Sequence, residues 1–256
     1  MRYIRPNLRG RLSRAARLLI PIFLVVMLAI VSSSPAFAQD KEEQSEEETI
    51  DPFESFNRTM FDLNIILDKA IGRPLAELYQ AILPFEARDS IRNFIRNLSS
   101  PVVLANDLLQ GEGERASDTT MRFLINSTLG IGGLFDTAHD MGFKYHSEDF
   151  GQTLAVAGIK EGPYLVLPIF GPSNFRDAAG KAVDSFLDPL TYIAAHNDAE
   201  LWLYGMRGTQ FVDFRARNIK TLDDLERDAF DYYSLIRSIY IQHRNSEILN
   251  GREKGK

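Results

Sequence analysis

The sequence contains no cysteine, which excludes disulfide bonds and every thiolate-based metal or redox site within it. Histidine is scarce too, with four residues at positions 139, 146, 196 and 243, and no two of them form the i, i+4 pair of a helical zinc site. The run His146-Ser147-Glu148-Asp149 carries metal-ligating side chains, but a polar loop is the simpler interpretation. We therefore expect no metal and no cofactor.

Signatures of catalysis are missing as well. No G-x-S-x-G nucleophile elbow is present. The glycine-rich run 130–133 lacks the spacing of a phosphate-binding loop, and it more plausibly permits close backbone packing or a hinge. A Ser/His/Asp triad stays open, because its members meet only in the folded chain. We expect a protein that is not an enzyme.

Basic residues are in short supply outside the N-terminus. Residues 39–256 hold 23 Lys and Arg against 35 Asp and Glu. Nucleic-acid binding needs a basic surface, so this acidic balance argues against a nucleic-acid partner.

The first 38 residues have the pattern of an export signal. Six arginines and no acidic residue accompany the apolar stretch 18–31, which ends before a small-residue site at Ala38. This stretch is too short for the roughly 20 residues of a spanning helix, and its flanks are those of a signal peptide. We predict cleavage after Ala38 and a disordered acidic leader over residues 39–50.

What remains has the periodicity of amphipathic helices. We predict a single all-α domain over residues 51–245 and a flexible C-terminal tail over 246–256. Asp51 and Pro52 start the first helix, which is expected to stop near Gly72, and Pro101 is expected to break a later one. Helices are predicted over 53–71, 91–98, 102–109, 114–129, 174–187, 195–214 and 221–243, and an extended crossing segment over 158–172.

The first predicted helix has an unusually broad apolar face that includes three phenylalanines. A core helix and a helix lying in a membrane interface both fit this pattern. On the next helix, Arg92 and Arg96 are placed to meet lipid phosphates, although a solvated face is the simpler alternative.

Several short blocks, in one order, make the sequence resemble the MlaA (VacJ) family between about Asp51 and Tyr192, with a looser similarity over 231–244. The blocks include DPFESFNR at 51–58, RFLINSTLG at 122–130 and GPS at 171–173. The residues that carry the resemblance are Asp51, Pro52, Phe56, Asn57, Arg58, Pro101, Asn106, Gln110, Gly111, Arg122, Asn126, Gly130, Gly133, Asp136, Gly151, Gly162, Pro163, Pro168, Gly171, Pro172, Arg176 and Asp177.

The resemblance implies a ring of amphipathic helices embedded in the inner leaflet of a Gram-negative outer membrane. A polar channel through the ring would remove mislocalised phospholipid from the outer leaflet and pass it to a periplasmic carrier, with a porin as a further partner. Candidate channel or lipid contacts are Arg92, Arg96, Asn126 and Asp136.

Many members of that family are acylated on a cysteine directly after the signal sequence, where this chain has Gln39. We therefore expect outer-membrane residence on the periplasmic-leaflet side without a lipoprotein anchor. Two alternative functions remain: a periplasmic lipid hydrolase, which would release fatty acid or headgroup from labelled phospholipid, and a surface interaction or virulence protein, which protease would reach on intact cells.

Overall fold

Helices make up most of residues 51–250, the part of the chain that this computed structural model describes. The predicted signal peptide, the acidic leader and the last six residues lie outside the described residues. The helices are α2 (Glu54–Leu67), the π-helix η1 (Asp68–Gly72), α3 (Arg73–Ile82), α4 (Phe85–Leu109), α5 (Gly113–Thr128), α6 (Thr137–Asp140), α7 (Phe150–Val156), α8 (Phe175–Leu187), α9 (Pro189–His196), α10 (Glu200–Arg217), α11 (Ile219–Asp228) and α12 (Tyr232–Leu249).

The predicted all-α class is confirmed, with one small addition. Within the predicted crossing segment, β1 (Tyr164–Leu167) and β2 (Gly171–Asn174) pair in an antiparallel hairpin, in which Tyr164 lies opposite Asn174. Pro168 lies in the turn, and Pro172 lies within the short β2 opposite Val166, in a two-stranded sheet where every strand is an edge and a proline is tolerated.

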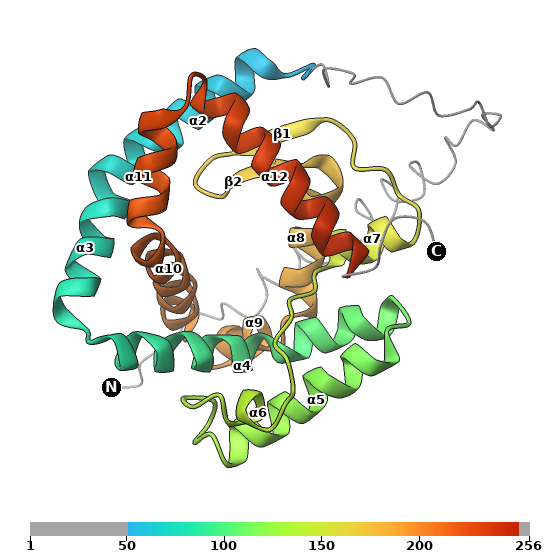
Figure 1. Cartoon of the computed structure of the whole chain (residues 1–256). Helices are drawn as coiled ribbons and strands as arrows, with labels where there is room; N and C mark the ends of the chain where they lie inside the picture. Colours follow the sequence, from blue (N-terminus) through green and yellow to red (C-terminus); the bar gives the residue numbers. More distant parts are fainter. Residues whose placement is uncertain (1–50, 251–256) are drawn as a thin grey trace, which may run out of the picture. The chain divides into compact units, whose positions relative to one another are not determined.

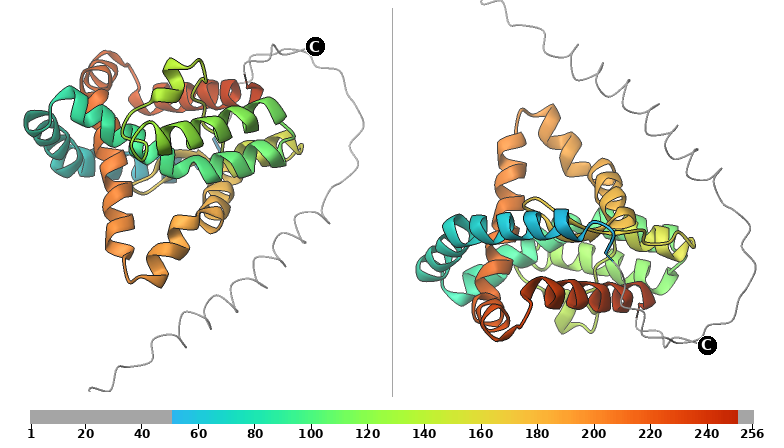
Figure 2. Two further views of the ribbon diagram at one scale, coloured as in Figure 1. Left: turned by 90° about the horizontal axis from the view of Figure 1, so that it is seen from below. Right: turned by 90° about the horizontal axis from the view of Figure 1, so that it is seen from above.

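The helices of the described unit follow one another around a ring. In Figure 1, α2, α3 and α4 run along three sides, and α12 returns across the remaining side in front of the hairpin. The segment α8–α9–α10 leaves the plane of this ring and comes back to it, as both views of Figure 2 show. Among the described helices, none is both long and apolar enough to cross a membrane.

A small aromatic core joins α2, the hairpin and α12. Phe61, Tyr164, Val166 and Tyr233 are buried together. The ring of Tyr233 meets those of Phe61 and Tyr164 edge-on, at centroid distances of 5.6 and 6.1 Å, a geometry that adds to the gain from burial. The contact between Phe61 and Tyr233 joins residues 172 positions apart and so closes the ring.

The first predicted helix does not stop at Gly72. The chain passes through η1 into α3, and Pro74 lies in the first turn of α3, where its missing amide hydrogen costs nothing. A Cβ at Gly72 would lie 2.6 Å from the Asp68 carboxylate oxygen, so a larger residue there would displace the carboxylate that pairs with Arg215. The result is one long arc of helix that bends without ending.

The predicted break at Pro101 is also wrong, because α4 continues through it. Ser99 and Ser100 donate hydrogen bonds to the carbonyls of Ile95 and Arg96, at 3.0 and 3.3 Å. These hydrogen bonds go to carbonyls other than that of Asn97, which loses its amide partner to Pro101, and serines bonded in this way bend a helix rather than strengthen it. The extensive packing of α4 along α5 is therefore what favours its continuation.

Three further boundaries differ from the sequence prediction. The helix predicted over 195–214 is divided between α9 and α10, and the one predicted over 221–243 between α11 and α12. Asp231 makes the second division, because its side chain caps α12 by accepting a hydrogen bond from the Ser234 amide. The tail predicted from 246 begins too early, since α12 continues to Leu249 and Asn250 ends it in a left-handed conformation.

Candidate functional site

The described residues expose apolar side chains and bury polar ones to an unusual extent. Thirty-six large apolar residues are exposed, whereas 13 apolar residues and 18 polar or charged residues are buried. A series of the exposed ones follows the arc of α2, η1 and α3: Phe53, Phe56, Leu63, Ile66, Ile71, Leu75, Leu78 and Ile82. We call these eight residues the apolar arc. So many exposed apolar side chains along one arc of helix indicate contact with a membrane or with an apolar partner.

The ring contains a cavity of about 910 Å³. Its walls come from α2, η1, α3, α10, α11 and α12, and from the hairpin turn at Ile169 and Phe170. Most of the lining is apolar, including Phe61, Ile65 and Phe211. This volume lies in the upper part of the range found for small-molecule sites.

The charged residues that line this cavity are paired with one another. Arg215 donates from Nε to Asp68 at 2.9 Å and lies 3.4 Å from Asp223, and Lys69 contacts Glu226 at 2.6 Å. Burial alone would lower the pKa of Arg215, but the hydrogen bonds from its guanidinium to Asp68 and Asp223 raise it above the ordinary value. The walls therefore offer few unpaired charges to an occupant.

Residues of the block at 51–58 form a buried polar clamp rather than a channel wall. Asn57 is fully buried and donates to both carboxylate oxygens of Asp51, at 3.1 and 3.0 Å, and to the Tyr164 carbonyl at 3.0 Å. It also accepts from the Val166 amide at 2.8 Å. Tyr233 donates to Asp51. This clamp ties α2 to β1 and α12.

Arg58 makes a second connection between α2 and α12. Its guanidinium donates to both carboxylate oxygens of Asp231, at 3.1 and 2.6 Å, and lies over the Tyr233 ring at 4.5 Å from the centroid. Hydrogen bonding from Arg58 holds the pKa of Asp231 well below its usual range. The same carboxylate that caps α12 therefore also holds it against α2.

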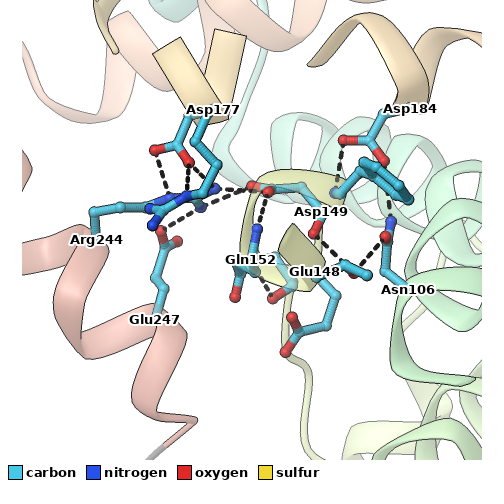
Figure 3. A network of polar contacts seen from close by, with 12 residues as sticks. Asn106, Glu148, Asp149, Gln152, Asp177, Asp184, Arg244 and Glu247 are labelled. Atoms are coloured by element: carbon cyan, nitrogen blue, oxygen red, sulfur yellow. Dashed lines mark hydrogen bonds and ion pairs between the residues drawn. The ribbon is translucent and has the colours of Figure 1, made fainter. Parts of the chain in front are cut away.

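A charged network joins α7, α8 and α12 (Figure 3). Arg244 donates to Asp149 and Asp177, with its shortest distances at 2.6 and 2.8 Å, and to Glu247 at 3.1 Å. Burial by itself would raise the pKa of Asp177, but hydrogen bonds from Arg244 and Tyr240 outweigh it and hold this pKa below the ordinary value. Arg176 lies beside Asp177 at 3.2 Å.

Glycines allow α7 and α8 to approach within this network. A Cβ on Gly180 would lie 2.4 Å from the Gly151 amide nitrogen, and one on Gly151 would lie 2.6 Å from Asp177 and Arg244 side-chain atoms. Real Cβ atoms do not come so close to backbone, so a side chain at Gly180 would force α7 and α8 apart. At Gly151 the added atom would instead displace the ends of the Asp177 and Arg244 side chains.

The neighbouring part of Figure 3 connects α4 to α7 and α8. Asn106, fully buried, donates to Asp184 at 3.0 Å and accepts from Thr153 at 2.8 Å. Gln110 and Arg115 donate to Glu148 at 2.8 and 2.5 Å. Burial raises the pKa of Glu148, and these two hydrogen bonds offset the rise only in part.

The candidates Asn126 and Asp136 lie in a further internal network. Arg122 donates to both carboxylate oxygens of Asp136 at 2.8 Å, and Asn126 donates to Asp136 at 3.0 Å. Gly133, at φ +96°, brings the glycine-rich turn against α4, where a Cβ would lie 2.5 Å from the Cβ of Asn97. At Gly130, a Cβ would meet the Phe135 carbonyl at 2.3 Å. Of the two roles expected for this turn, close packing is the one that the geometry supports.

The arginine candidates differ from each other. Arg92 is paired with Asp89. Arg96 stacks on the Tyr145 ring at 4.1 Å from its centroid and lines a small polar cavity of about 20 Å³ together with Asn126 and Asp136. Burial lowers the pKa of Arg96, with a smaller opposing effect from Tyr145. The cavity has room for a water molecule, so three of the four candidates meet around one small polar space.

A histidine also lies close to an acid and a hydroxyl, but without the geometry of a catalytic triad. His146 Nε2 lies 3.1 Å from both Thr119 Oγ1 and Asp107 Oδ1. In a triad the acid and the nucleophile contact different ring nitrogens, whereas here both contact the same one. The Thr119 hydroxyl itself donates to Asp107 at 2.7 Å and is buried.

The other residues of the recognised pattern lie at turns, helix ends and surfaces. Gly111, Gly162 and Gly171 have φ between +68° and +75°, where glycine carries no steric penalty. Pro52, Pro163 and Pro168 lie between elements, Pro172 lies within β2, Pro101 lies within α4, and Phe56 belongs to the apolar arc. Sequence reasoning missed Tyr233 and Arg244, which are too distant in sequence from their partners for spacing to reveal them.

Comparison with known proteins gives a consistent result. The family model described as MlaA lipoprotein matches residues 49–247. An Escherichia coli K12 protein named intermembrane phospholipid transport system lipoprotein MlaA is 34% identical over 207 residues, covering 79% of this chain and 80% of the relative. A Haemophilus influenzae protein of the same name is 30% identical, covering 90% and 91%. An uncharacterised Rickettsia prowazekii protein is 38% identical, covering 78% and 79%.

A solved structure described as "Structural basis for maintenance of bacterial outer membrane lipid asymmetry" is similar at a TM-score of 0.68 and 33% identity. It covers 78% of this chain and 99% of the solved chain. The similarity therefore extends over nearly all of the known fold.

These names correct the expected mode of membrane attachment. Both the family description and the named relatives are lipoproteins, which contradicts the expectation of outer-membrane residence without a lipoprotein anchor. That expectation depended only on the absence of cysteine from the sequence, and an absence of this kind is weak evidence about how a protein is held to a membrane.

Proposed function

The chain belongs to the MlaA family, and from this premise we propose that it transports phospholipid between membranes and so maintains the lipid asymmetry of an outer membrane. The names of the relatives and of the similar structure support this. The observation that carries the proposal in this chain is the apolar arc on a ring whose buried residues are largely polar. Such a ring can lie among acyl chains and still enclose a path for a lipid.

The path that we propose is amphipathic. The cavity of about 910 Å³ offers apolar walls, and the space around Arg96 offers polar groups. A phospholipid needs both kinds of surface, because its tails require apolar contact and its phosphate requires hydrogen-bond donors. Arg92 and Arg96 are the proposed phosphate contacts, and Asn126 and Asp136 the proposed polar lining beside them.

The direction and the partners are finer parts of the proposal. We infer that phospholipid moves from the outer leaflet of the outer membrane to a soluble carrier in the periplasm, and that a porin holds the ring in place. A purified carrier that gains labelled lipid only when this chain is present in the donor vesicles would support the direction. Equal transfer without the chain would contradict it.

We propose that transport involves no bond cleavage. The geometry around His146 supports this, because its acid and its hydroxyl share one ring nitrogen. Purified protein incubated with labelled phospholipid is expected to return the lipid intact. Released fatty acid or headgroup, abolished by His146→Ala, would favour the hydrolase instead.

The main test is complementation. A Gram-negative strain that lacks its own family member is expected to expose phosphatidylethanolamine at its surface, where a membrane-impermeant amine reagent labels it. Expression of this chain should lower that labelling toward the level of the parent strain. Undiminished labelling, in cells whose outer-membrane fraction contains the folded protein, would contradict the proposed function.

A further inference from the structure

Two glycines in the middle of α10 have no role in the packing of the described residues. A Cβ on Gly205 or Gly208 would meet no other atom within 4 Å, in contrast to Gly180, where backbone blocks it. Glycine inside a helix costs free energy relative to alanine. Neither residue has a positive φ or a close neighbour that would account for this cost.

Both glycines line the large cavity, on the face of α10 that also presents Phe211, Val212 and Phe214. Positions 205, 208 and 212 are three and four residues apart and so lie along one stripe of the helix. The missing side chains therefore widen the cavity along its α10 wall.

The opposite walls present apolar groups that remain accessible. Ile169 and Phe170 at the hairpin turn are 69% and 74% exposed, and Ile71 and Leu75 are 55% and 45% exposed. These last two also belong to the apolar arc, so the cavity is continuous with the surface that we assign to the membrane.

The charges at the cavity wall favour an uncharged occupant. Arg215 is engaged by Asp68 and Asp223, and Lys69 by Glu226. A charged group that entered would have to displace one of these pairs, whereas an apolar chain would only cover surface that is otherwise left to water. Continuity with the apolar arc provides a way for such a chain to enter.

We propose that this cavity binds an acyl chain of the transported phospholipid, and that Gly205 and Gly208 keep the α10 wall open for it. This inference rests on the proposed function and adds to it the place where the tail lies. It also assigns the two glycines a role in the width of the path.

The test uses the full chain in detergent with a phosphatidylethanolamine that carries a photoreactive group in its acyl chain. Cross-links to the wild type are expected within 205–215 and at the hairpin turn. In Gly205→Leu/Gly208→Leu the added side chains fill the cavity, and these cross-links should fall about fivefold or more, which corresponds to roughly 1 kcal/mol of binding free energy.

Two controls match this variant. Gly205→Ala/Gly208→Ala adds little volume and should keep the cross-links, and Gln210→Leu adds the same side chain to α10 at an exposed position outside the cavity lining. All three variants should be as stable to heat as the wild type or more so, because leucine and alanine favour the helix. Unchanged cross-linking in the double leucine variant, or cross-linking only by a lipid with its photoreactive group in the head, would overturn the proposal.

Complementation distinguishes a failure of the proposed transport function from a failure of the proposed acyl-chain site. If the wild type fails to lower surface phosphatidylethanolamine, the proposed function fails whatever the cavity binds. If the wild type succeeds and the double leucine variant succeeds equally, transport stands and the acyl-chain site is wrong. The expected result is success for the wild type and both controls, with a clear loss for the double leucine variant.

Discussion

At the scale of single residues, the stability of the fold depends on ion pairs in which every buried charge has its partner. Arg244 contacts three carboxylates and has only 9% of its side chain exposed. Removing one partner of a buried pair costs about 3–5 kcal/mol, because the other charge stays desolvated. The networks of Figure 3 therefore make α7, α8 and α12 depend strongly on one another.

Asp177→Asn tests this dependence. The carboxylate is buried, and its pKa is lowered in the folded protein, mainly because hydrogen bonds from Arg244 and Tyr240 outweigh the effect of burial. A lowered pKa stabilises the fold above the unfolded value of 3.8, and this contribution is lost as the pH falls through the folded value. We expect Asp177→Asn to lower the free energy of unfolding at pH 7 and to flatten its rise between pH 2 and pH 5.

Chemical denaturation in mild detergent across this pH range provides the measurement. Asp228→Asn is the matched control, since Asp228 pairs with Arg227 at 2.8 Å but both side chains are 66% exposed, and exposed pairs contribute about 1 kcal/mol at most. Equal losses in the two variants would show that burial of the network does not matter.

Two of the four channel candidates, Arg96 and Asp136, should differ in the effect of substitution, one on transport and the other on stability, because their contacts differ. Arg96 has a stacking contact with Tyr145 but no ion pair within the described residues, whereas Asp136 neutralises Arg122, which is 8% exposed. Arg96→Met is expected to lower transport severalfold in the complementation assay with little change in melting temperature. Asp136→Asn is expected to lower the melting temperature instead. A loss of folding in Arg96→Met would reassign Arg96 to structure.

At the scale of helices, glycine decides where two elements touch. Gly180→Ala places a Cβ against the backbone of α7, at 2.4 Å from the Gly151 nitrogen, and overpacking of this kind costs about 1–3 kcal/mol. Gly205→Ala enters open space and should stabilise the chain by about 0.5–1 kcal/mol through helix propensity. Thermal unfolding of the two variants should move in opposite directions, and movement in the same direction would contradict the packing at Gly180.

Sequence periodicity located most helices but not their ends, for reasons that individual residues show. Pro101 satisfies every rule for a helix break, yet α4 continues through it and packs along α5. Periodicity alone places Asp231 within a continuous helix, because its partner Arg58 lies 173 residues away. Local rules describe the chain next to a residue, whereas these outcomes depend on tertiary partners.

The candidate site was predictable to a similar degree. The ordered motif blocks pointed to the family, and the stripe of α2 pointed to an apolar surface. The sequence left open whether that stripe faced a core or a membrane, and the structure gives it a buried and an exposed part: Phe61 is buried, and Phe56 and Ile66 are exposed. No sequence pattern marks Gly205 and Gly208, because the open space beside them is visible only in the folded chain.

At the scale of the whole described unit, the ring inverts the arrangement usual in water. Its apolar arc is exposed, while amides and ion pairs such as Asn57–Tyr164 and Arg215–Asp68 hold its elements together. Within a bilayer, apolar contact between helices brings little gain over contact with lipid, so polar and close-packed contacts have to hold the assembly. This accounts for a family pattern composed largely of polar residues, glycine and proline.

The apolar arc itself can be tested by placing charge on it. Leu78 and Ile82 are 54% and 66% exposed on α3, and a charged side chain in a bilayer costs up to about 2.5–3.5 kcal/mol. Leu78→Asp should therefore reduce flotation of the purified chain with phospholipid vesicles by about tenfold or more, and Leu78→Asp/Ile82→Asp should reduce it further. Ser117→Asp, which adds the same charge at an exposed position of α5 outside the arc, is the control that should float like the wild type. The arc is the surface that we propose to hold the ring among acyl chains. Vesicle binding that survives both charges would mean that the arc does not hold the ring in the membrane, and the proposed lipid path would then lose its access to lipid.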